Sequence, residues 1–137
     1  MQFSRMAVAL ATDDIAASRD FYVTHLGFTP AAELDWYVSL HHPDHPGQVL
    51  DLLDKDHPSI PALYRGRDVD GVTLAVLVDD AAQEEERLRA AGVPIAEPLE
   101  DMPWGQRRFH LTAPEGTHVE VVQFFDPQPL PPAAELG

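Results

Sequence analysis

Residues 7–30 read AVALATDDIAASRDFYVTHLGFTP, and residues 73–95 read TLAVLVDDAAQEEERLRAAGVPI. Each stretch contains a short β-type run, an Asp-Asp pair, a helical stretch that ends at a glycine, and the start of a second strand. The Asp-Asp pair supplies oxygens that can cap the first N–H groups of the helix. Gly27 and Gly92 stand where the end of a helix needs a residue with positive φ. The sequence therefore predicts two copies of one supersecondary module.

Two more strand signals follow each helical stretch. In the first half they are residues 36–41 and 48–53, separated by the loop HPDHPG. In the second half they are residues 106–112 and 117–124, joined by the turn sequence A-P-E-G. Each half therefore reads β-α-β-β-β.

The short turn also predicts the register of the last hairpin. If Pro114, Glu115 and Gly116 form the loop, counting outward along the two strands places His110 opposite Glu120 and Arg108 opposite Val122. A carboxylate beside a His raises the His pKa, or makes a dyad for proton transfer or ligand anchoring. The alternative is a surface cross-strand pair without a function.

The domain organisation follows from these modules. They cover about residues 4–53 and 70–125, with a polar linker at 54–69, inside a single domain of residues 1–125. Residues 126–137, DPQPLPPAAELG, are predicted to be a Pro-rich extended tail.

Composition excludes several classes of function. The chain has 137 residues, with 9 Lys and Arg against 23 Asp and Glu, so its formal charge is −14. Nucleic acids and anionic membrane surfaces are therefore not expected partners, whereas a cationic or neutral ligand is. The absence of Cys removes disulfides, thiolate metal sites and Cys nucleophiles. With neither a membrane-spanning run nor a convincing signal peptide, we expect a cytoplasmic protein.

The two faces of the predicted strands differ in character, because side chains alternate between faces. One phase is bulky and apolar and predicts the core packed against the helices. The other phase is small or polar and predicts a concave, partly wet surface, although a two-layer structure with a solvated second face is the alternative. The residues of this second phase are Ala7, Ala9, Asp51, Thr73, Ala75 and Glu120.

The segments DDIAASRDFYVTHLGF (13–28) and PWGQRRFHLTAPEGTHVEVVQF (103–124) resemble the vicinal oxygen chelate superfamily. That superfamily includes glyoxalase I, bleomycin-resistance proteins, fosfomycin-resistance enzymes and extradiol dioxygenases. The resemblance covers about residues 4–125. It implies an α+β fold in which two βαβββ modules form a cleft-shaped mixed β-sheet, and it implies a homodimer. It says less about function, because this fold hosts many chemistries.

The resemblance also implies where a metal would be bound. Metal-dependent members place one ligand on each of four strands, and these positions fall here on Ala7, Asp51, Thr73 and Glu120. Ala and Thr do not make a credible Zn, Ni or Fe site, so no metal cofactor is expected. The alternative is that Asp51 and Glu120, with waters, hold a divalent hard cation. A Tyr common in the metal enzymes is replaced by His110.

A chain that lacks the metal ligands but keeps the cleft resembles the bleomycin-resistance branch of the superfamily. We therefore expect a metal-free protein that sequesters a cationic or polycyclic antibiotic or natural product, with no catalytic residues. The expected ligand-binding residues are Tyr37, Ser39, Asp51, Trp104, Arg108, His110, Glu120 and Phe124. The alternative is a lyase, isomerase or dioxygenase in which Glu120 and His110 act as acid and base. An interaction module without a ligand is a third hypothesis.

Two other features have a structural interpretation that we favour. His41, His42 and His45 lie with Asp44 in a Pro-broken loop, where a solvated loop is favoured over a metal cluster. Trp36 shares a phase with core residues and is expected in the core.

Overall fold

The computed structural model describes residues 1–125, so the predicted tail at 126–137 lies outside the described residues. The chain divides into two compact units. The first contains Met1–Val72 together with Ala113–Thr117, and the second contains Thr73–Thr112 and the described residues that follow Thr117. Neither of the described helices has the length and apolar character needed to cross a bilayer.

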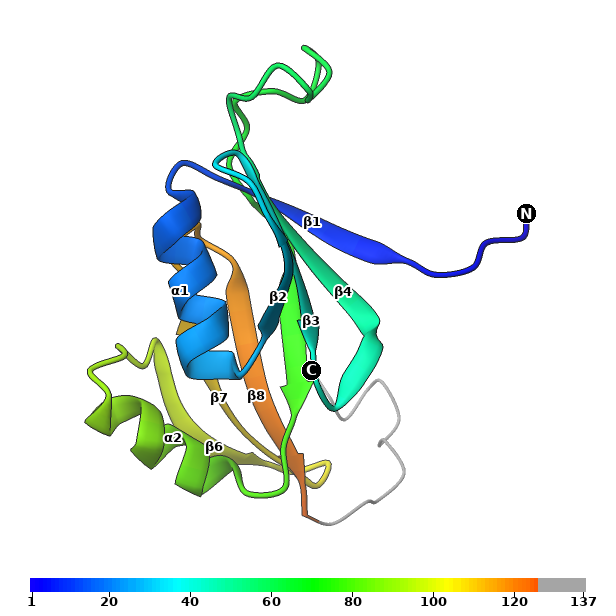
Figure 1. Cartoon of the computed structure of the whole chain (residues 1–137). Coiled ribbons are helices and arrows are strands. Elements are labelled where there is room, and N and C mark those ends of the chain that lie inside the picture. Colours follow the sequence, from blue (N-terminus) through cyan, green and yellow to red (C-terminus); the bar gives the residue numbers. More distant parts are fainter. Residues whose placement is uncertain (126–137) are drawn as a thin grey trace. The chain divides into compact units, whose positions relative to one another are not determined.

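The first unit is built on one βαβββ module, in which a four-stranded sheet has the order β1-β4-β3-β2 (Figure 1). Strand β1 runs parallel to β4, and the other neighbours are antiparallel. The predicted HPDHPG loop is too long, because β4 already begins at His45 and leaves only Pro43 and Asp44 between the strands. The elements are β1 (Ala7–Thr12), α1 (Ile15–Leu26), β2 (Thr29–Glu33), β3 (Tyr37–His42) and β4 (His45–Asp54).

The second unit repeats this arrangement, with the strand order β5-β8-β7-β6. Strand β5 runs parallel to β8, while β8, β7 and β6 are antiparallel neighbours. The elements are β5 (Thr73–Leu77), α2 (Ala81–Ala90), β6 (Glu97–Met102), β7 (Gln106–Thr112) and β8 (His118–Phe124). The predicted repeat of two βαβββ modules and the α+β fold class are confirmed.

The predicted helix signals form as expected. The Asp14 side chain accepts a hydrogen bond from the Ala17 N–H at 3.0 Å, and Asp80 caps α2 in the same way. Gly27 ends α1 with φ of 78°. A Cβ at this position would also lie 3.2 Å from Nε2 of His42, so a larger residue would be strained both in its backbone and by this contact.

One helix covers one face of each sheet. In the first unit α1 packs on β3 and β4, and in the second α2 packs on β6, β7 and β8. The strand residues that face each helix form the core. They are Leu10, Val38, Leu40, Leu50 and Leu52 in the first unit, and Phe109, Leu111, Val119 and Val121 in the second.

The burial of Val8 and Val122 differs from the predicted alternation along their strands, and Trp36 does not lie in the core as predicted. Val8 lies at the edge of its sheet and is 37% exposed, whereas Val122, in the predicted polar phase, is only 2% exposed. Trp36 is half-buried and stacks on the His57 ring, with 4.0 Å between ring centroids. Trp36 lies outside the core, and its stacking partner His57 belongs to the loop that follows β4.

The hairpin register is confirmed. The Ala113 N–H donates to the Thr117 carbonyl at 2.9 Å, and His110 lies opposite Glu120 and Arg108 opposite Val122. The turn itself belongs to the first unit by its contacts.

Glu115 anchors that turn to α1. Its carboxylate accepts hydrogen bonds from the Ser18 hydroxyl at 2.9 Å and from the Tyr22 hydroxyl at 2.7 Å. Tyr22 is fully buried. Burial and the neighbouring charge of Glu115 raise the pKa of the Tyr22 phenol well above its ordinary value. The phenol therefore stays protonated and remains a donor to the carboxylate.

We expect Tyr22→Phe to lower the free energy of unfolding by about 1–3 kcal/mol, because it removes the donor and leaves a charged acceptor with one partner fewer. Urea denaturation at neutral pH measures this loss. Tyr64→Phe is the control, since Tyr64 is 59% exposed, and it should change stability by less than about 0.5 kcal/mol. Equal losses in both variants would contradict a stabilising role for the Tyr22–Glu115 bond.

Candidate functional site

The helix-free face of the first sheet carries Tyr37, Ser39 and Asp51. Ser39 lies directly opposite Asp51 in the β3–β4 ladder, and Ala9 lies opposite Asp51 on its other side. Oδ1 of Asp51 is buried and has no hydrogen-bond partner among the described residues. A buried carboxylate oxygen without a donor costs free energy, so the Asp51 carboxylate has unused hydrogen-bonding capacity on this face.

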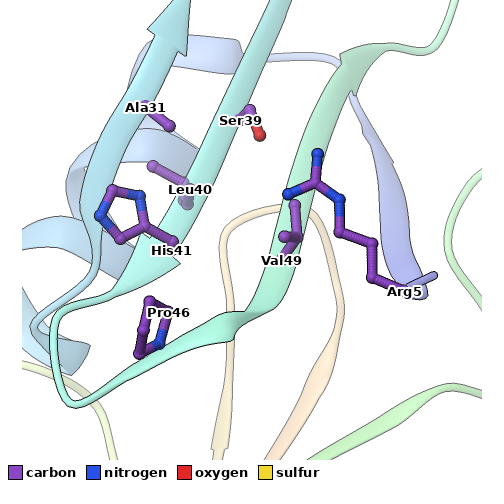
Figure 2. A pocket seen from close by; sticks show the side chains of 7 residues that line it. All are labelled: Arg5, Ala31, Ser39, Leu40, His41, Pro46 and Val49. Carbon is purple, nitrogen blue, oxygen red and sulfur yellow. The ribbon is translucent and has the colours of Figure 1, made fainter.

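The same face contains a half-open hollow of about 250 Å³ (Figure 2). Its polar groups are the Arg5 guanidinium, the Ser39 hydroxyl and the His41 imidazole, which come from the N-terminal segment and from β3. Figure 2 shows the Arg5 side chain extending past Val49 toward the strand that carries Ser39. The lining residues are Arg5, Ala31, Ser39, Leu40, His41, Pro46 and Val49.

On the helix-free face of the second sheet, three side chains form a hydrogen-bonded chain. The Thr73 hydroxyl lies 2.8 Å from Nδ1 of His118, and Nε2 of His118 lies 2.7 Å from Nδ1 of His110. Among residues 1–125, Nε2 of His110 has no hydrogen-bond partner and forms the end of this series of hydrogen bonds. That nitrogen can accept or donate a proton, depending on how the tautomers are set.

The predicted register of His110 opposite Glu120 is confirmed, but the predicted rise of the His110 pKa is wrong. His110 bonds to His118, while the carboxylate of Glu120 lies 3.5 Å from the Arg108 guanidinium. Desolvation, followed by the charges of Arg108 and His118, lowers the pKa of His110 below its ordinary value of 6.5. These effects outweigh the opposite influence of Glu120 and Glu97.

Aromatic groups lie toward the other end of the β7–β8 ladder, near Gln106 and Arg108. The Trp104 indole N–H donates to the Gln106 side-chain oxygen at 2.7 Å, and the Arg108 guanidinium lies over the Trp104 ring at 5.7 Å. Phe124, opposite Gln106 in the β7–β8 ladder, is 52% exposed. Flat aromatic surfaces of this kind can stack on a planar ligand.

The structure thus places the predicted residues on two separate faces. Tyr37, Ser39 and Asp51 share the helix-free face of the first sheet, and the remaining ones belong to the second unit: Trp104, Arg108, His110, Glu120 and Phe124. A cleft that combines the two sets stays a prediction.

Sequence reasoning missed His118, Arg5 and His41. A signal for His118 was present, because it lies two residues before Glu120 on the same strand and so shares its face. The parallel pairing of β5 with β8, which brings Thr73 next to it, had no local signal.

The His-rich turn of the first unit does not assemble a metal cluster. Nδ1 of His42 lies 3.8 Å from a carboxylate oxygen of Asp44, and the His42 and His45 rings are 6.0 Å apart. Within residues 1–125, no group of three or more His, Cys, Asp or Glu side chains is arranged to hold a metal ion.

Comparison with known proteins places this geometry in a family. A model of the Glyoxalase/Bleomycin resistance protein/Dioxygenase superfamily matches residues 6–121. The chain belongs to this superfamily. A search of curated proteins gave no match.

Among solved structures, a glyoxalase/bleomycin resistance protein/dioxygenase from Nocardioides is 26% identical, with a TM-score of 0.73 over 96% of this chain and 91% of its own. Lactoylglutathione lyase from Agrobacterium tumefaciens is 23% identical, with a TM-score of 0.71 over 89% and 94%. TnmS3, an antibiotic-binding protein from Streptomyces sp. CB03234, is 24% identical, with a TM-score of 0.66 over 90% and 98%. The last two likenesses show the fold alone.

The residues at the expected metal-ligand positions do not fit a transition metal. Ala7 has no donor atom, and the Thr73 hydroxyl is already bonded to His118. Glu120 lies beside the Arg108 guanidinium, which competes for its carboxylate. The four positions therefore supply at most the two carboxylates of Asp51 and Glu120, without an imidazole or thiolate, and such a set does not make a Zn, Ni or Fe site.

We expect the NMR-detected titration of the His110 ring to have its midpoint below pH 6.5. Arg108→Gln should raise this midpoint, because it removes a nearby positive charge and releases Glu120. The folded state disfavours the protonated His110 ring. The contribution of His110 to the free energy of unfolding is therefore fully present above its unfolded-state pKa, and it falls as the pH drops from there toward the lower folded-state pKa.

Arg89→Gln is the control, because it removes the same charge from an exposed position on α2 of the same unit. It should leave the His110 midpoint unchanged. A midpoint at or above the ordinary value in the unmodified chain would contradict the desolvated environment of His110.

Proposed function

We propose that this chain is a metal-free binding protein that sequesters a small antibiotic or natural product with a cationic or polycyclic structure. The observation that carries the proposal is the buried, unpartnered oxygen of Asp51 on an uncovered sheet face. A ligand with a positively charged donor satisfies this acceptor, and the chain's formal charge of −14 attracts such a ligand.

The second unit offers aromatic surface of its own for a planar ligand. Trp104 and the exposed Phe124 provide planar apolar surface, and Glu120 lies beside the Arg108 guanidinium that covers the Trp104 ring. The antibiotic-binding protein TnmS3 has the same fold, so the scaffold is compatible with holding a drug. Retention of such a compound without turnover is the resistance function that we propose.

We propose that the chain acts as a homodimer that completes the binding cleft. Each sheet has two edge strands with a single neighbour within the sheet, β1 and β2 in the first unit and β5 and β6 in the second. Such edges have unpaired N–H and C=O groups that favour pairing with another chain. On β5, Leu77 is 68% exposed and is paired with Val122 of β8. Phe124, two residues after Val122 on β8, is also exposed. Burying this apolar surface against a second copy of the chain is more favourable than leaving it exposed to water.

A second candidate function rests on the Thr73–His118–His110 chain. Because His118 fixes the orientation of His110, and the low pKa keeps His110 neutral near pH 7, its free nitrogen is suited to act as a general base. Lactoylglutathione lyase shares the fold. The alternative is therefore a lyase, isomerase or dioxygenase that uses Glu120 and His110 as acid and base.

A binding measurement separates these two functions. We expect proflavine, a planar cation, to raise the melting temperature, with about 2.7 kcal/mol of stabilisation at a hundredfold excess over its Kd, and the compound should be recovered unchanged. Asp51→Asn should weaken this binding about tenfold through the loss of a charge-assisted hydrogen bond.

Asp35→Asn, at an exposed position between β2 and β3, should have no effect on proflavine binding. Ni²⁺, Zn²⁺ and Mn²⁺ should leave the melting temperature unchanged. A metal-dependent shift that chelator reverses, or a product that no longer forms in Glu120→Gln, would replace the sequestration proposal with the enzyme.

We expect sedimentation velocity at micromolar concentration to show a dimer. Leu77→Asp should dissociate it, because this change places a charge in the exposed apolar surface of β5. Leu63→Asp is matched in exposure, since Leu63 is 67% exposed in the loop after β4, and it should leave the dimer intact. If the unmodified protein stays monomeric at concentrations up to about 100-fold higher, the dimer is contradicted. This range of concentration corresponds to about 2.7 kcal/mol of association free energy.

A further inference from the structure

Arg5 differs from the other cationic side chains of the described residues. Most of the others are held by carboxylates; Arg65 donates to backbone carbonyls, and Arg67 lies over the Tyr64 ring. The carboxylate-paired cations are Arg19, Lys55, Arg87, Arg89, Arg107 and Arg108. Within residues 1–125, Arg5 makes no ion pair, although the chain has a large excess of acidic residues.

The position of this unpaired guanidinium is specific. It lines the hollow on the helix-free face of the first sheet, together with Ser39 and His41 (Figure 2). A guanidinium, a hydroxyl and an imidazole are all hydrogen-bond donors, and a guanidinium binds a carboxylate through two parallel hydrogen bonds. The polar part of the hollow is therefore suited to an anionic group.

Asp51 is not one of the residues that line the hollow, but its charge affects what kind of anion can bind there. It lies opposite Ser39 in the ladder, and one of its oxygens is buried without a partner. A ligand with only negative charge would be repelled by this carboxylate and by the chain's net charge. A ligand that also has a protonated nitrogen gains from both neighbours, since the nitrogen can donate to Asp51 while the anion accepts from Arg5.

We infer that this hollow is a carboxylate subsite, and that the ligand of this protein is a zwitterion with its carboxylate at Arg5, Ser39 and His41 and its ammonium group at Asp51. The volume of about 250 Å³ is below that of most drug-sized pockets, so the hollow holds one end of the ligand. This inference deepens the proposed function and rests on it in taking the ligand to be a small molecule with a cationic group.

Three small probes test the subsite in the full chain by NMR: 4-(aminomethyl)benzoate, which has both charges, benzylammonium and benzoate. We expect the zwitterion to bind more tightly than either singly charged probe and to shift the backbone amides of Ser39, His41 and Asp51. Arg5→Gln should weaken the zwitterion about tenfold, as expected for a charge-assisted bidentate contact, and should leave benzylammonium unchanged.

Arg67→Gln is the matched control, because it removes the same charge from the loop after β4, and it should change none of the three affinities. A zwitterion that binds no better than benzylammonium, or equal effects of Arg5→Gln and Arg67→Gln, would overturn the subsite. If the subsite fails in this way while proflavine still binds, the proposed function stands. If neither benzylammonium nor proflavine binds, but the zwitterion and benzoate shift Ser39 and His41 in an Arg5-dependent manner, the subsite stands and the proposed function fails.

Discussion

Each module has one helix for a four-stranded sheet, and a sheet has two faces. Because α1 packs on β3 and β4, and α2 on β6, β7 and β8, each helix covers one face of the sheet in its own unit. Side chains alternate along a strand, so every second residue is left on the uncovered face. Burial of Leu52 and Val121 against the helices therefore directs Asp51 and Glu120 to the surfaces on which a ligand can be bound.

The two uncovered faces satisfy their polar groups in different ways. On the second sheet, Thr73, His118 and His110 bond to one another, and Arg108 lies beside Glu120. On the first sheet, Asp51 has a buried oxygen without a donor, and Arg5 has no carboxylate partner in the described chain. The first face therefore has unused hydrogen-bonding capacity, while the second has a formed network that sets the protonation of His110. This difference is the reason that we propose a binding role for the first face and keep the acid–base alternative for the second.

Much of the fold could be predicted from the sequence, because its signals are local. The caps at Asp14 and Asp80 and the register of the 113–117 turn depend on residues only a few positions apart. The candidate site was less predictable. His110 was correctly placed opposite Glu120, yet its partner is His118 and its pKa moves down instead of up. Hydrogen-bond geometry and desolvation decide such outcomes, and neither can be obtained from strand alternation.

The sequence alone determined the repeat of two βαβββ modules, the cap of each helix and the face to which Asp51, His110 and Glu120 belong. It also determined that Ala7 cannot be a metal ligand, since an alanine has no donor atom. The tertiary structure decided the remaining features: the contact of Glu115 with Ser18 and Tyr22, the pairing of Thr73 with His118, and the hollow that brings Arg5 to Ser39. These contacts join residues far apart in the chain. They depend on where parallel strands and chain ends meet in space, which periodicity and spacing do not specify.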